Sequence, residues 1–77
     1  MTEGYVVTGA HITNGVVLYA AARGKGDRGQ TPDLADAQFF RSARSADTRR
    51  WQMANPYVFW AIADARRLPD GTIEVVP

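Results

Sequence analysis

Residues 57–65 read Tyr-Val-Phe-Trp-Ala-Ile-Ala-Asp-Ala, an apolar run interrupted only by Asp64. A run of this length and composition predicts a β-strand in the interior of a sheet. Successive side chains of a strand point to opposite sides. One side therefore carries Val58, Trp60 and Ile62, and the other carries Tyr57, Phe59, Ala61 and Ala63. Both sides of this strand are apolar, so both need a cover.

A β-hairpin is predicted around Asn14-Gly15, with strands over residues 5–13 and 16–22. Asn-Gly between two such runs favours a two-residue type I′ turn, in which both residues adopt positive φ. This turn pairs Thr13 with Val16 and, further along, Ala10 with Tyr19. Neither side of the hairpin is clearly polar: one carries Val6, Thr8, Ala10, Ile12, Val17, Tyr19 and Ala21, and the other carries Val7, Gly9, His11, Val16, Leu18, Ala20 and Ala22.

Residues 23–33 are expected to form a loop, and two interpretations of the chain after it stay open. In the first, Thr31 caps a helix that has Pro32 in its first turn and runs to Ala54. Proline is well tolerated there because the first helical N–H needs no partner.

In the second interpretation, residues 35–41 form a short strand, and a helix starts from a Ser42 cap and ends at the Asn-Pro pair 55–56. Serine is a favoured cap, and the residue before a proline disfavours helix. Adjacent Phe39 and Phe40 suit a strand covered on both sides, so we favour this interpretation.

A second hairpin is predicted at the end of the sequence. Pro69 fixes φ near −65°, which excludes a type I′ turn and favours a type I turn with Gly71 in the left-handed conformation. Residues 72–76 then form the closing strand, and this register places Arg66 opposite Glu74. The predicted fold is α+β: a small antiparallel sheet of four to five strands with one principal helix, in ββ(β)αββ order.

One helix covers one side of a sheet, whereas the strands of this sheet are apolar on both sides. Two arrangements could account for an apolar side of the sheet that the helix does not cover. Either the sheet curls onto itself, or the uncovered side is a contact surface, since large exposed apolar patches usually mark interaction sites. We favour a contact surface for self-association or for binding a partner.

The composition excludes several classes of protein. A chain of 77 residues is expected to form one domain. It has no cysteine and one histidine, which excludes disulfides, thiolate metal sites and multi-histidine sites within one chain. No apolar run reaches the roughly 20 residues of a membrane span, and the sequence before residues 16–22 lacks the basic residues of a signal peptide. We expect a cytoplasmic protein without cofactor or membrane partner.

The charged residues give a formal net charge of +1, with nine Lys+Arg and eight Asp+Glu. Residues 24–29 match the Gly-x-Gly-x-x-Gly pattern, but Gln30-Thr31-Pro32 follows them and no parallel βαβ crossover fits, as a dinucleotide site requires. The loop is instead expected to be a mobile, positively charged connection. The alternative is a flexible basic loop whose Arg23, Lys25 and Arg28 reach phosphate groups or acidic side chains.

Four arginines lie on or beside the predicted helix: Arg41, Arg44, Arg49 and Arg50. They form either a stripe for nucleic acid or an acidic partner, or a solvated helix surface. The interleaved aspartates and the low net charge favour the solvated surface. Trp51 is expected to pack beneath the helix.

No residue pattern supports catalysis. His11 lies within a strand without a second histidine, a cysteine or a carboxylate pair, and is expected to be a packed or edge residue. Ser42, Ser45 and Thr48 have no base at a defined spacing. We therefore expect a protein that is not an enzyme.

The pattern Asp33-Leu34-x-x-Ala37-x-x-Phe40-x-Ser42-x-x-x-Ala46 resembles small phage and prophage proteins, in which a turn leads through a short strand into a Ser-capped helix. These proteins include anti-CRISPR inhibitors and other counter-defence factors that bind large host complexes without catalysis. The resemblance implies binding of a host protein or ribonucleoprotein complex. The charge balance excludes a DNA mimic, which needs a dense carboxylate surface.

The first hairpin, residues 6–19, also looks similar to a family of uncharacterised bacterial proteins associated with sulfite reduction. This sequence departs from that family in its Arg-rich middle and its lack of a basic C-terminal tail. The likeness leaves a homodimeric structural protein as a further alternative.

The sequence thus predicts a non-enzymatic binding protein of the phage inhibitor or accessory type, and as an alternative a nucleic-acid-binding module that uses the basic loop and the helix arginines. The residues expected to bind the partner are Arg23, Lys25, Arg28, Arg41, Arg44, Arg49, Arg50, Tyr57, Phe59 and Trp60.

Overall fold

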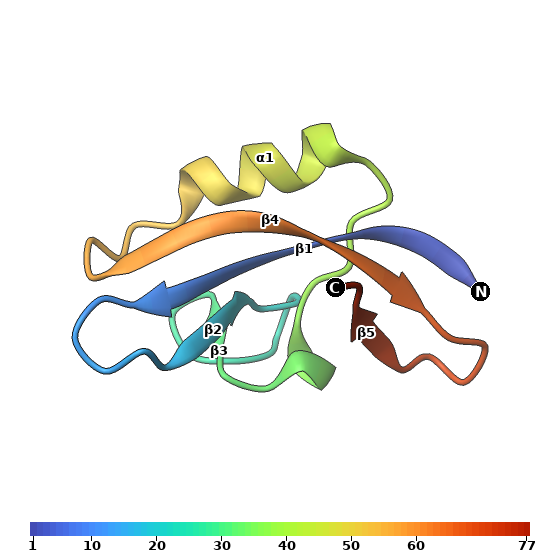
Figure 1. The fold of residues 1–77 in the computed structure, drawn as a ribbon, viewed down its shortest axis with the longest axis horizontal. Helices are drawn as coiled ribbons and strands as arrows, with labels where there is room; N and C mark the ends of the chain where they lie inside the picture. The colour runs from blue at the N-terminus through green and yellow to red at the C-terminus, as the bar shows by residue number, and fades with distance from the viewer.

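The computed structural model describes all residues, Met1–Pro77. It is an α+β fold in which five antiparallel strands form one sheet in the order β3-β2-β1-β4-β5. The helix α1 lies along one side of the sheet, and the short 3₁₀ helix η1 lies on the other (Figure 1). In chain order the elements are β1 (Thr2–His11), β2 (Val17–Ala20), β3 (Gln30–Thr31), η1 (Leu34–Asp36), α1 (Ala43–Gln52), β4 (Val58–Arg67) and β5 (Ile73–Val75). The α+β prediction is confirmed.

The longest ladder joins β1 to β4, with Thr2 opposite Arg67 at one end and His11 opposite Val58 at the other. It forms as the apolar run predicts, although β4 begins one residue later and continues to Arg67. Both strands lie inside the strand order, although β5 pairs with β4 only at Ala65–Arg67. Both faces of these strands are apolar because each face contributes to an apolar cluster.

The first hairpin forms, but its predicted register is wrong. Thr8 lies opposite Tyr19 and Ala10 opposite Val17, a shift of two residues from the prediction. The connection spans residues 12–15: Gly15 has φ of 71° but Asn14 does not have positive φ, so no type I′ turn forms. The Asn14 side chain instead accepts a hydrogen bond from the backbone N–H of Val16 at 2.9 Å. Because a shift of two residues preserves the strand alternation, each side chain still points to its predicted side.

The segment between the loop and α1 differs from both interpretations. Asp33 caps η1 by accepting from the N–H of Ala35 at 3.0 Å, so no long helix starts at Thr31. No strand forms over residues 35–41 either: only Ala37 and Phe40 form isolated bridges, to Ala21 and Tyr5. The third strand is β3, inside the predicted loop.

The predicted start of the main helix is confirmed. The Ser42 hydroxyl accepts from the N–H of Ser45 at 3.1 Å and caps α1. The helix ends at Gln52, three residues before the expected stop at Asn55. Ala46 is its buried residue, so α1 approaches the sheet closely through a small side chain.

Two apolar clusters lie on the two sides of the sheet. Under α1, Val7, Ala20, Phe40 and Ala46 pack with Tyr5, Met53, Trp60 and Ile62. On the other side, Val6, Ala37 and Ala65 pack with Tyr19, Leu34, Phe39, Ala63 and Ile73. The neighbours Phe39 and Phe40 therefore enter opposite clusters. Leu34 of η1, Phe39 and Ile73 of β5 cover this part of the side that α1 leaves free.

The hairpin between β4 and β5 forms in the predicted register, with a closing strand, Ile73–Val75, shorter than the predicted residues 72–76. Gly71 has φ of 90° and Arg66 lies opposite Glu74, with their side chains paired at 3.0 Å. The backbone N–H of Thr72 donates to Asp70 Oδ1 at 2.9 Å, and this bond, followed by one from the Thr72 hydroxyl, holds the pKa of Asp70 below its ordinary value.

The lowered pKa of Asp70 predicts a pH dependence of stability. A carboxylate whose pKa is lower in the folded state stabilises the fold at neutral pH, and this contribution disappears as the pH falls through the folded pKa. We expect Asp70→Asn to lower the urea midpoint at neutral pH and to match the wild type in acid below that pKa. Urea titrations across the acid range check this; an equal difference at every pH would contradict it.

Candidate functional site

One end of the sheet carries exposed apolar side chains on the side opposite α1. Val17, Ala10 and Phe59 lie in one row across β2, β1 and β4. Phe59 is 78% exposed, Ile12 54% and Val17 48%. With the exposed Ala10 and Ala61, these residues form what we call the sheet-end patch, defined as Ala10, Ile12, Val17, Phe59 and Ala61.

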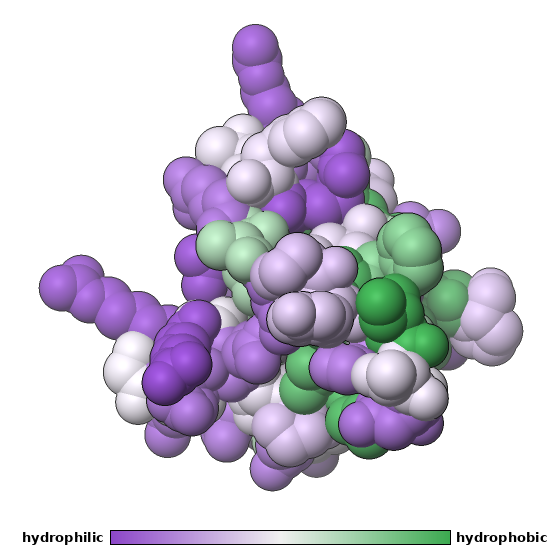
Figure 2. Space-filling model, turned by 90° about the vertical axis from the view of Figure 1, so that its left-hand side faces the viewer, coloured by the Kyte–Doolittle hydropathy of each residue, from purple (hydrophilic) through white to green (hydrophobic).

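The patch is exposed because the elements on this side of the sheet, η1 and β5, do not extend over it. The elements η1 and β5 protect only the half of this side that contains Val6, Ala63 and Ala65. The half next to the first hairpin has no element over it. Figure 2 views the molecule from this end, and hydrophobic residues gather on one part of that surface beside a largely hydrophilic remainder.

The predicted aromatic site residues separate into two groups. Tyr57 is exposed, and its ring stacks against that of His11 with centroids 6.1 Å apart. Phe59 belongs to the patch. Trp60 does not join them, because it points to the helix side and packs in the cluster under α1; its assignment to a partner surface is therefore wrong.

The prediction for Trp51 is also wrong. It does not pack beneath α1 but is 75% exposed, with the Arg50 guanidinium 4.8 Å from its ring centroid. Arg50 is also paired with Asp47 at 2.8 Å. Trp60 and Met53 supply the large apolar groups under the helix that Trp51 was expected to supply.

The structure brings three of the predicted basic residues together. Arg28 and Arg49 line one hollow of about 490 Å³, and Arg23 and Arg49 line a second of about 370 Å³. Gln52 also lines both hollows, so they adjoin along α1. We call the pair the arginine groove.

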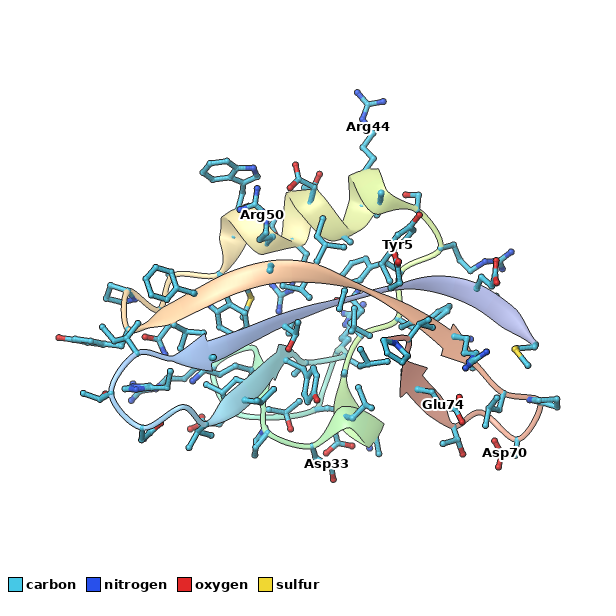
Figure 3. All side chains as sticks on the ribbon, in the orientation of Figure 1. Tyr5, Asp33, Arg44, Arg50, Asp70 and Glu74 are labelled. Atoms are coloured by element: carbon cyan, nitrogen blue, oxygen red, sulfur yellow. The ribbon has the colours of Figure 1, made fainter.

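The other predicted basic residues lie elsewhere. Lys25 is exposed and lines neither hollow. Arg41 lines a different hollow together with Glu3 and Asp64. Arg44 extends from α1 away from the sheet (Figure 3). The helix arginines therefore do not form one stripe.

Polar side chains complete the arginine groove and hold its two walls together. Arg49 Nη2 donates to the carbonyl of Gly29 at 3.2 Å, which ties α1 to the loop before β3. Asn55 Nδ2 donates to Gln30 Oε1 at 3.4 Å, and Asn55 Oδ1 accepts from the N–H of Tyr57 at 3.0 Å. Sequence reasoning missed Gln30, Gln52 and Asn55, because only the packing of distant segments makes them neighbours.

The Gly-x-Gly-x-x-Gly segment forms a tight turn instead of a nucleotide-binding loop. Its three glycines all adopt positive φ, and Asp27 bridges to Gln30 across the turn. Gly29 leads directly into β3, so no helix N-terminus faces the loop as a pyrophosphate site of this type requires.

His11 lies at the end of β1 and is part of a local hydrogen-bond arrangement. Its Nδ1 accepts from the backbone N–H of Thr13 at 3.2 Å and lies 2.7 Å from the Thr13 hydroxyl. With its stacking on Tyr57, this makes His11 a residue at the end of an interior strand that supports the turn.

Comparisons with family models, with curated proteins and with solved structures find no match for this chain. Neither α1 nor η1 has the length and apolar character needed to cross a membrane.

Proposed function

We propose that this chain is a non-enzymatic binding protein that docks through the sheet-end patch on an apolar surface of another protein. The observation that carries the proposal is the exposure of Phe59, Ile12 and Val17 on one side of the sheet. The largest exposed apolar patch of a monomeric protein often serves an interaction.

The size of the patch favours a partner larger than a second copy of the chain. If an aromatic side chain offers ~150–250 Å², the patch exposes on the order of 400 Å², about half of the ~800 Å² that each partner of a standard interface contributes. A permanent homodimer needs a larger apolar area than this. The patch suits the apolar centre of a contact whose border extends over neighbouring polar residues.

This function agrees with the resemblance of residues 33–46 to phage accessory proteins that bind host complexes. We propose the same class for this chain: an inhibitor or accessory factor that acts by occupying a surface of a host protein or ribonucleoprotein complex. The patch lacks charged residues, so the protein surface that it contacts should be apolar and uncharged as well.

Site-specific photo-crosslinking tests the patch. We expect benzoyl-phenylalanine at position 59, in lysate of the native host, to give one discrete adduct with an identifiable protein, and Ile12→Asp in the same chain to abolish it. Benzoyl-phenylalanine at position 51 is the matched control, since Trp51 is an equally exposed aromatic residue outside the patch.

Two results would contradict the proposal. An adduct of twice the chain mass, with dimers in sedimentation, would show that a second copy occupies the patch. The same adducts from positions 51 and 59, or none from position 59, would show that the patch selects no partner.

A further inference from the structure

The three arginines of the groove have no carboxylate partner. The ion pairs of the molecule join Arg50 to Asp47 and Arg66 to Glu74, and none involves Arg23, Arg28 or Arg49. No Asp or Glu lines either hollow of the groove. The groove therefore concentrates positive charge that the net charge of +1 conceals.

Five of the eight acidic residues lie away from this groove, whereas Asp27 lies beside Arg28 in the loop and Asp47 on α1 is paired with Arg50. Asp33, Asp70 and Glu74 lie on the side of the sheet opposite α1 (Figure 3). Glu3 and Asp64 line a separate hollow with Arg41. Attraction of an anion depends on this local distribution of charge more than on the total.

We propose that the arginine groove binds the phosphodiester backbone of a single-stranded nucleic acid. Guanidinium groups match the geometry of phosphate oxygens, and Arg23, Arg49 and Arg28 line two adjoining hollows along α1. An extended chain with regularly spaced negative charges fits this arrangement. A single small anion would engage only one of the hollows.

The remaining walls suit bases as well as backbone. Gln52 presents an amide group that both donates and accepts hydrogen bonds, and Gln30 keeps its amide N–H donors beside the bond from Asn55 to Gln30 Oε1. Tyr57 lines the end of the groove and is more than half exposed, with its ring held against His11. Proteins that bind single strands commonly combine a basic groove with such an aromatic platform for base stacking.

This inference is independent of the docking proposed for the sheet-end patch, because the patch and the groove share no residue. Together they fit a ribonucleoprotein partner, with the patch on protein and the groove on the RNA strand. Photo-crosslinking tests the sheet-end patch, and oligonucleotide binding to the isolated chain tests the arginine groove.

Fluorescence anisotropy with labelled oligo(U) and oligo(dT) of about 12 nucleotides tests the groove on the isolated chain. We expect binding whose affinity falls about 20-fold between about 50 and about 200 mM salt, since three phosphate contacts give a logarithmic slope of about −2 at ~0.7 per contact. Arg28→Gln should weaken binding about tenfold and reduce the slope by about 0.7.

Arg44→Gln is the matched control, because it removes the same charge from an exposed residue that lines neither hollow; its affinity should stay within twofold of the wild type. Arg49→Gln should also weaken binding, and its circular dichroism spectrum should be recorded because Arg49 bonds to Gly29. The Arg28 side chain makes no hydrogen bond or ion pair within the protein, so Arg28→Gln is expected to fold. This variant therefore tests the groove even if Arg49→Gln fails to fold.

Three results would overturn the assignment. The first is no binding of either oligonucleotide at low salt, and the second is equal weakening by Arg28→Gln and Arg44→Gln. The third is an affinity for oligoglutamate or for free uridine monophosphate equal to that for oligo(U), which would assign the groove to acidic peptides or to small phosphates instead of a strand.

Discussion

Replacing Phe40 by alanine is expected to lower the free energy of unfolding by about 3–5 kcal/mol, the usual cost of emptying a buried phenylalanine site. Phe40 is 7% exposed and belongs to the cluster under α1 with Val7 and Ala46. Those neighbours are small or β-branched and fixed on β1 and α1, so they cannot close the cavity. Domains of ordinary stability unfold with about 5–15 kcal/mol, so this variant should lose much of its folded population.

Phe59→Ala is the matched control for Phe40→Ala, since it deletes the same side chain from an exposed site. It should change the free energy of unfolding by less than about 0.5 kcal/mol. Thermal melts followed by circular dichroism measure both, with about 4–8 °C expected per kcal/mol in a domain of this size. If the two variants lost similar stability, Phe59 would be part of the core and the sheet-end patch would not exist.

Replacing Gly4 by alanine is expected to be nearly as harmful, although it adds a single methyl group. A Cβ at this position would collide with the carbonyl oxygen of Phe40 and with the Phe39 ring. The carbonyl cannot retreat, because it accepts the N–H of Tyr5 at 2.7 Å while Phe40 N–H donates to Tyr5 at 2.8 Å. We expect a loss of about 3 kcal/mol, at the upper end of the range for overpacking.

The control for Gly4→Ala is Ala10→Val, which enlarges a side chain on the same side of β1 at an exposed position. Its free energy of unfolding should change little, because valine is favoured in strands. Urea titration of both variants checks the comparison. A neutral Gly4→Ala would mean that the segment carrying Phe39 and Phe40 does not cross β1 as closely as described.

Local signals predicted the elements that depend on a few neighbouring residues. The run at 57–65 predicted β4 because a short continuous apolar run is typical of a strand inside a sheet. Ser42 predicted the start of α1 because its hydroxyl satisfies a helical N–H. Pro69 and Gly71 predicted the last turn because each restricts or permits particular φ values.

The features that sequence reasoning missed depend on contacts between distant segments. The Asn14-Gly15 signal was overridden by a four-residue connection whose Ile12 N–H bonds to the Tyr57 carbonyl at 2.8 Å. Phe39 and Phe40 were correctly expected to be covered on both sides. Phe40 bridges Tyr5 without forming a regular strand, and the two rings pack in the clusters on opposite sides of the sheet.

The candidate site was predicted only in part for the same reason. The alternation of strands correctly separated Phe59 from Trp60 but did not show which side α1 would cover. Trp51 was misplaced because α1 has few large apolar residues, so its sequence does not define a buried side. The arginine groove required the loop before β3 to meet α1, and no pattern within either segment predicts that contact.

The ladder between β1 and β4 also determines when folding can occur during synthesis. All of β1 pairs with residues 58–67 along one edge, whereas on its other edge only Thr8–Ala10 pair with β2 and Tyr5 bridges Phe40. Most hydrogen bonds of β1 therefore form only when β4 is present. Contacts of such wide separation in sequence slow folding. A nascent chain stalled before β4 emerges from the ribosome would expose β1, whose largest fully buried side chains are Val6 and Val7, and would be a natural client for a chaperone that recognises extended apolar segments.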